Sequence, residues 1–192
     1  MDYPIKNVAL TKVNFEDNFW KKRLETNAKV TIPANFKKCE ETGRVDNFLK
    51  AAKKMAGPHT GLFFNDTDVF KTMEGAAYQL HRQPDEKLES YLDNLIQIIA
   101  DAQEEDGYLY TARTVDPTAV KADREGLTRW ANLKVNHELY NLGHMYEAAV
   151  AHYEATGKKN FLDIALKSAD LVDSVFGSDK KHDVPGHQEI EM

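Results

Sequence analysis

The feature that most constrains the fold is a pair of apolar patterns with helical periodicity. Between Asp85 and Ala102, apolar residues recur mainly at spacings of three and four, which predicts an amphipathic helix with one buried face. The segment from Glu138 to Ala155 is apolar on nearly every side, which predicts an enclosed helix. The segment from Phe161 to Phe176 again carries a single apolar stripe. An enclosed helix is therefore followed by a half-exposed one.

The same order occurs earlier in the chain and defines an internal repeat. Glu74, within the helical segment Val69 to His81, matches Glu147 of the second pair, and Asp85 matches Asn160 at an offset of about 73 to 75 residues. Repeats of this length are typical of stacked helical hairpins. The pattern therefore predicts an all-α fold, an α/α toroid with an inner and an outer ring. Both glutamates lie in the middle of enclosed helices, so each needs a partner.

Glycine and proline predict where helices end. Gly157 should cap the enclosed helix in the left-handed conformation, and Asn160 should cap the next helix through its side-chain oxygen. Phe15 to Met55 is also helical in pattern, with Pro33 and Gly43 as the expected breaks.

Charge and hydropathy exclude two classes of partner. A formal charge of −6 without a clustered basic stripe argues against nucleic acid, which needs lysine and arginine to displace counterions. No stretch approaches the ~18 apolar residues of a membrane span, so we expect no membrane partner. Met1 to Lys6 lacks the basic start and apolar core of a signal peptide. We therefore expect a cytoplasmic protein as written, or a secreted or periplasmic one if a leader was removed.

A single cysteine limits the redox and metal chemistry. Cys39 allows neither an intramolecular disulfide nor a multi-cysteine metal site, and it is most simply a small buried hydrophobic residue. His137 and His144 are seven residues apart, which is not the close pair of a zinc enzyme's helix. A histidine at position 144 is commonly a core residue satisfied by a neighbour. We therefore predict no metal ligand and no cofactor on this chain.

Candidate binding residues lie where inner helices begin. In a toroid these helices start at one end of the ring, so residues 65–68, 132–138 and 186–189 should converge on a shared cavity. Their acids, amides and imidazoles could hydrogen-bond sugar hydroxyls. The candidate substrate-binding residues are Asp68, His137 and His187.

Each candidate also has a purely structural interpretation. Residues 66–68 are ordinary N-cap and first-turn residues, favoured by the helix dipole. His137 and His187 are equally explained as core histidines. Tyr108 and Trp130, in the long connection between the two hairpins, could stack on a sugar but are more often core residues.

Eight short motifs carry a family resemblance: Thr42–Phe48, Phe64–Lys71, Glu74–Tyr78, Gln103–Leu109, His137–Tyr140, Gly143–His144, Glu147–Ala151 and Gly186–Glu191. In that order they resemble the N-terminal part of glycoside hydrolase family 127, the β-L-arabinofuranosidases. The match spans nearly the whole chain, and several ordered motifs are far more specific than one.

The resemblance implies an (α/α)6 catalytic barrel that removes terminal L-arabinofuranose with retention. It also implies a cysteine nucleophile held on zinc by further cysteines and a glutamate, with a separate glutamate as acid/base. Those residues lie later in the family than this chain reaches, so we predict no catalytic residue here and expect zinc only in the full-length enzyme. Family sugar-contacting histidines look like His137 and His187. An early glutamine-bearing loop has no clear counterpart.

These observations define one leading hypothesis and two alternatives. Residues 1–192 are expected to be the N-terminal part of an α/α-barrel catalytic domain, a partial (α/α)6 toroid truncated at the C-terminus, because residues 183–192 look like the start of a third inner helix. The expected function is part of a glycoside hydrolase releasing terminal L-arabinofuranose from plant-type glycans. A sugar epimerase or lyase on the same toroid, and a non-catalytic helical-repeat binding module, are the alternatives. Part of a ring would expose inner helices, so we expect self-association.

Overall fold

The computed structural model describes residues 5–6, 8–9, 12–118 and 128–191. Apart from one isolated bridge between Phe176 and Lys181, every regular element in those ranges is helical, which confirms the all-α prediction. The main helices are α1 (Trp20–Thr26), α2 (Ile32–Glu41), α3 (Arg44–Ala51), α4 (Asp66–Arg82), α5 (Glu86–Ala102), α8 (Glu138–Thr156) and α9 (Asn160–Val175). Two short helices, α6 (Thr111–Val115) and α7 (Leu133–Asn136), lie between the hairpins.

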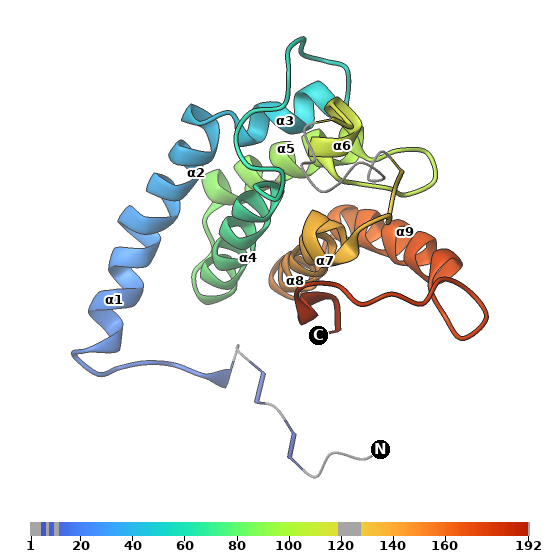
Figure 1. Ribbon diagram of the computed structural model, residues 1–192. Helices are drawn as coiled ribbons and strands as arrows, with labels where there is room; N and C mark the ends of the chain where they lie inside the picture. The colour runs from blue at the N-terminus through green and yellow to red at the C-terminus, as the bar shows by residue number, and fades with distance from the viewer. Residues whose placement is uncertain (1–4, 7, 10–11, 119–127, 192) are drawn as a thin grey trace.

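The predicted repeat is two helical hairpins that pack side by side. Helices α4 and α5 form the first hairpin, and α8 and α9 form the second. Helix α4 packs along α8, and α5 packs against α9 (Figure 1). The inner helices thus meet each other and the outer helices cover them, as in two neighbouring sectors of an α/α toroid.

Capping explains where α5 begins and where α8 ends. Asp85 precedes α5 and its carboxylate accepts from the backbone N–H groups of Lys87 and Leu88, at 3.0 and 3.1 Å. Gly157 ends α8 with φ +72°, as predicted.

The side-chain oxygen of Asn160 contacts the start of the next helix as predicted, but the helix begins one residue earlier than predicted. Helix α9 begins at Asn160 itself, and the residue before it makes no side-chain cap hydrogen bond within the described structure. The Asn160 side-chain oxygen accepts from the Phe161 N–H at 3.0 Å, while its amide nitrogen donates to Asp93 on α5 at 3.1 Å. The side chain therefore contacts both the first turn of its own helix and the neighbouring hairpin.

The predicted break at Pro33 is also wrong, whereas the break at Gly43 is confirmed. Helix α1 continues into α2 through a π-helical turn, Asn27–Thr31, in which the Ile32 N–H donates to the Asn27 carbonyl five residues back (Figure 1). We attribute the tolerance of Pro33 to this wider turn, because proline crowds the carbonyl four residues before it. Gly43 has φ +75° and separates α2 from α3.

The connection between the hairpins contributes to the core. Tyr108 and Trp130 are buried there, which confirms their core interpretation, and Cys39 is buried as expected. Residues 119–127 of this connection lie outside the described residues.

One expectation for the second half of the chain needs correction. Helix α8 is not enclosed on every side, since Val150 and Tyr153 are 47 % and 39 % exposed. The segment expected to begin a third inner helix ends in a 3₁₀ turn, Gln188–Glu191, that packs on α8. Among the described residues, no helix is both long and apolar enough to cross a membrane.

Candidate functional site

The structure brings His137 and His187 together. Their imidazole centroids lie 5.0 Å apart with a 48° angle between the rings. His137 has a left-handed backbone, φ +59°, directly before α8, and His187 directly precedes the 3₁₀ turn. The expectation that these two side chains lie at the same end of the helical stack is confirmed.

Gly186 allows this approach. Its N–H donates to the Leu133 carbonyl at 3.3 Å, and a Cβ at this position would lie 2.2 Å from the carbonyl oxygen of Lys134. No side chain fits in that space, so glycine lets the segment lie directly against α7. The next residue, His187, is thereby held beside His137.

Aromatic rings surround the histidine pair. Phe64, before α4, stacks on His137 with centroids 4.9 Å apart and an interplanar angle of 29°. Tyr140, in the first turn of α8, lies 5.3 Å from His137 and 4.8 Å from His187. His187 is exposed and His137 is half-buried, so His187 is not a core residue.

The surroundings of His137 determine its protonation. Burial lowers its pKa below 6.5, and the nearby His187 acts in the same direction, while the hydrogen bond to the Val135 carbonyl opposes them. Because a carbonyl oxygen only accepts, Nδ1 carries the proton in this hydrogen bond. Neutral His137 therefore keeps a lone pair on Nε2 that can accept a hydrogen bond.

Lys71 links the pair to the neighbouring hairpin. It projects from α4, and its Nζ donates to the Tyr140 hydroxyl at 2.5 Å. This contact places a cationic side chain next to the aromatic ring that touches both histidines.

Asp68 lies elsewhere. Its carboxylate accepts from Nε of Arg44 at 2.5 Å, and it lines a pocket with residues of α2 and α3. Within the described structure, no contact joins Asp68 to either histidine. The ion pair with the Arg44 guanidinium, at the start of α3, holds this carboxylate on the side of α4 that faces α2.

Sequence reasoning placed Glu138 among the residues of the expected cavity, but it did not identify the buried contacts that this carboxylate makes beside the site. This carboxylate is buried in the first turn of α8 and accepts from the Tyr108 hydroxyl at 2.5 Å and from the Trp130 N–H at 3.1 Å. Arg113 lies 3.7 Å away. Burial raises the pKa of Glu138, and these partners oppose that shift. The signal in the sequence was an acidic residue inside an otherwise apolar helix, which requires buried partners.

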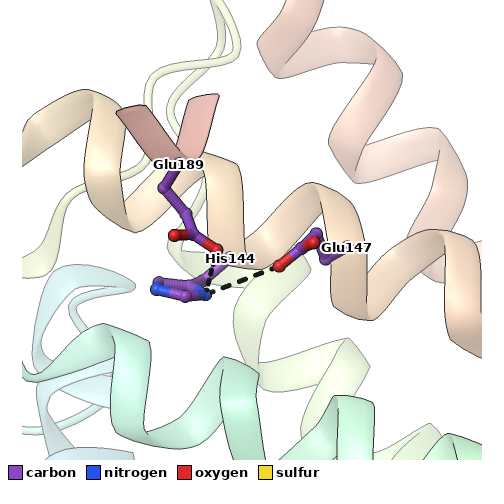
Figure 2. A group of neighbouring side chains, drawn as sticks. All are labelled: His144, Glu147 and Glu189. Atoms are coloured by element: carbon purple, nitrogen blue, oxygen red, sulfur yellow. Dashed lines mark ion pairs between the residues drawn. The ribbon is translucent and has the colours of Figure 1, made fainter. Parts of the chain in front are cut away.

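A second cluster was also missed. His144 and Glu147 on α8 face Glu189 of the 3₁₀ turn, with the two carboxylates on the same side of the imidazole (Figure 2). Nδ1 of His144 is 3.1 Å from Glu189 Oε1 and 3.7 Å from Glu147 Oε2. Glu147, which the sequence placed in the middle of an enclosed helix and therefore expected to have a partner, has His144 and Glu189 as neighbours. Because Glu189 comes from another segment, helical periodicity could not reveal the group.

Glu74, the repeat counterpart of Glu147, also has a partner. Burial and a hydrogen bond to Glu74 raise the pKa of the Tyr78 hydroxyl to about 12. Glu74 in turn adds to the negative potential at Glu147 on the neighbouring inner helix.

This chain does not fit the zinc–thiolate site that the resemblance implies. Cys39 is its single cysteine, and it is 4 % exposed in the apolar core. A thiolate cluster requires several sulfur ligands converging on one point.

Comparisons with known proteins agree with the motifs. The family model described as the β-L-arabinofuranosidase, GH127 catalytic domain, matches residues 12–192. A curated non-reducing end β-L-arabinofuranosidase from Bifidobacterium longum subsp. longum is 40 % identical over 150 residues, covering 77 % of this chain and 22 % of the relative.

The chain is also similar in fold to solved structures. A GH127 β-arabinofuranosidase is 53 % identical with a TM-score of 0.87, covering 97 % of this chain and 30 % of that structure. A GH127 β-L-arabinofuranosidase from Geobacillus stearothermophilus T6 is 38 % identical with a TM-score of 0.86, covering 93 % and 28 %. The chain spans less than a third of the length of these relatives. Within that span, the matched residues and the fold show that the chain belongs to the GH127 β-L-arabinofuranosidase catalytic-domain family.

Proposed function

We propose that this chain forms part of the sugar-binding site of a glycoside hydrolase that releases terminal L-arabinofuranose from plant-type glycans. The observation that carries the proposal is the pairing of His137 and His187, whose imidazoles lie 5.0 Å apart although they come from different segments. Both residues belong to motifs that resemble the family, and all three relatives are named arabinofuranosidases.

The chemistry of the pair suits a furanose with several hydroxyls. Neutral His137 offers Nε2 as an acceptor, and the exposed imidazole of His187 offers a second polar group at the same place. The rings of Phe64 and Tyr140 supply apolar surface for the C–H groups of the sugar.

The role of Asp68 is a separate part of the proposal. Its ion pair with Arg44 leaves the carboxylate outside the contacts of the histidine pair. We propose that it contacts a more distant part of the glycan and that the terminal arabinose lies at the histidines.

Nuclear magnetic resonance can test the proposal on the 192-residue chain. Titration with L-arabinose should shift the imidazole signals of His137 and His187, with an affinity on the order of millimolar because one sugar makes few contacts. His137→Ala and His187→Ala should each weaken binding about tenfold, because each variant loses one hydrogen bond between neutral groups and the ring contacts beside it.

His182→Ala is the matched control. His182 lies in the same segment as His187 and is exposed, but its ring contacts the Ser178 carbonyl instead of the pair. Affinity should not change in this variant. Equal affinity in His137→Ala, His187→Ala and the unsubstituted chain would overturn the proposed sugar site.

A further inference from the structure

A compact donor set joins helix α8 to the 3₁₀ turn. One nitrogen of His144 and one carboxylate oxygen each from Glu147 and Glu189 all lie within 4.8 Å of one another. The two nitrogen–oxygen distances are 3.1 and 3.7 Å (Figure 2). Ligands bound to one small divalent ion at about 2.1 Å lie roughly 3.0–3.5 Å apart, so little movement separates these atoms from a coordinating arrangement.

His144 provides an observation independent of the acidic residues. The residue is only 7 % exposed, yet neither ring nitrogen has a hydrogen-bond partner within the described structure. Nδ1 faces both carboxylates, but the contact is not aligned as a hydrogen bond. A buried imidazole without hydrogen bonds costs folding free energy. The nitrogen that carries the lone pair is also a common metal ligand.

The negative charges of this cluster are poorly compensated. Glu147 faces Glu189 directly, and Glu74 on α4 adds to the same potential.

We propose that His144, Glu147 and Glu189 form a binding site for a divalent first-row transition metal ion, such as zinc or manganese. One imidazole with two carboxylates suits such ions, whereas calcium and magnesium favour oxygen ligands alone. The site contains no sulfur, so it is separate from the zinc–thiolate site implied by the family. It does not depend on the proposed sugar site.

Space for the remaining ligands is present beside the cluster. Glu147 and Glu189 line an open pocket of 420 Å³ together with Tyr78 and Gly143. Water or a substrate oxygen can therefore complete the coordination shell.

The ion would link two parts of the chain that carry the histidine pair. Glu189 follows His187 by two residues, and His144 lies one turn after Tyr140, with these two rings 4.7 Å apart. Coordination would hold the 3₁₀ turn against α8. It would thereby fix the segment that presents His187.

Isothermal titration calorimetry of the metal-stripped chain with zinc chloride and manganese chloride tests the site directly. We expect one ion per chain, with a dissociation constant for zinc below about 10 μM. Glu147→Gln and Glu189→Gln should each weaken binding at least tenfold, because the amide removes a charged ligand without changing its size. Both side chains are partly exposed, so the helices should be retained, as checked by circular dichroism.

Two controls separate this site from its neighbours. Glu154→Gln changes an exposed glutamate of the same helix and pocket, and it should leave zinc affinity unchanged. His187→Ala should also retain zinc, because His187 is not a proposed ligand. Loss of zinc binding in His187→Ala, its retention in both glutamine variants, tighter binding of calcium than of zinc, or no binding at all would overturn the proposal.

Discussion

The hydroxyl of Tyr108 donates a hydrogen bond to Oε1 of Glu138 at 2.5 Å, joining the connection after α5 to the first turn of α8. The backbone N–H of Trp130 donates to the same carboxylate, at 3.1 Å to each oxygen. Glu138 directly follows His137 in the sequence. The buried carboxylate therefore holds the connection and the candidate site in one arrangement.

Tyr108→Phe should destabilise the protein. The substitution keeps the ring but removes a donor from a buried carboxylate, so the free energy of unfolding should fall by about 1.5–3 kcal/mol. Urea denaturation measures the change. Tyr153→Phe removes a hydroxyl from an exposed tyrosine of α8 and should change the free energy little. Equal stability of the two variants would contradict the role of the Tyr108–Glu138 contact.

Asp66 should make stability depend on pH in a defined direction. Burial raises its pKa from 3.8 to about 6, although Thr111 donates to it through both its hydroxyl and its N–H. The folded state therefore binds a proton more tightly than the unfolded state. The contribution is fully present below pH 3.8 and is lost as pH rises through about 6, up to about 3 kcal/mol.

Asp66→Asn tests this linkage. The amide keeps an acceptor for Thr111 and carries no charge, so the variant should gain stability relative to the unsubstituted chain between pH 4 and pH 7. Chemical denaturation at several pH values measures the difference. Asp163→Asn changes an exposed aspartate in the first turn of α9 and serves as the control. A pH-independent difference for Asp66→Asn would show that Asp66 does not titrate in this range.

Most of the fold could be predicted because local patterns fix it. Helices α4, α5, α8 and α9 carry apolar stripes and clear end signals, so their existence and pairing follow from periodicity. The meeting of His137 and His187 followed from placing both near the beginnings of inner helices. Their contact with each other also depends on Gly186, which lets the closing segment lie directly against α7.

The remaining features depend on partners that the local sequence does not identify. Asp68 pairs with Arg44 across two helices, and Asn160 binds Asp93 of another hairpin. Glu189 reaches His144 only because the 3₁₀ turn folds back on α8. Such contacts are decided by tertiary packing, which a single sequence without aligned relatives does not reveal.

Exposed apolar side chains on the inner helices predict self-association. Tyr78 of α4, Val150 of α8 and Tyr153 of α8 are 39–47 % exposed, and the first two line the same pocket. Sedimentation velocity should show a concentration-dependent oligomer that Val150→Glu weakens. Leu166→Glu, on the outer helix α9, should have less effect. A monomer at high concentration would contradict the prediction.

The isolated chain should not hydrolyse aryl β-L-arabinofuranosides. It has one cysteine, which is buried, so a thiolate nucleophile on a multi-cysteine zinc site cannot form from its residues. Release of the aryl group, followed by absorbance, should equal the buffer blank. Turnover that persists through purification and scales with chain concentration would show that the chain carries a catalytic group of its own.

Two glycines of the inner helices should respond oppositely to alanine. A Cβ at Gly143 would lie 2.6 Å from the carbonyl carbon of Glu189, so Gly143→Ala must displace the 3₁₀ turn from α8. A Cβ at Gly75 of α4 would meet no described atom within 4 Å, aside from its own helix backbone and chain neighbours. Gly75→Ala should therefore stabilise the protein by about 0.5–1 kcal/mol, because alanine favours the helix.

The readout for Gly143→Ala is the position of His187. Because His187 lies directly before the displaced turn, its ring should move away from Tyr140, now 4.8 Å distant between centroids. Nuclear Overhauser effects between these rings should weaken in Gly143→Ala and persist in Gly75→Ala. The helices do not depend on this turn, so circular dichroism should change little in either variant. Unchanged ring contacts in Gly143→Ala would mean that the close approach of Glu189 to α8 does not position His187.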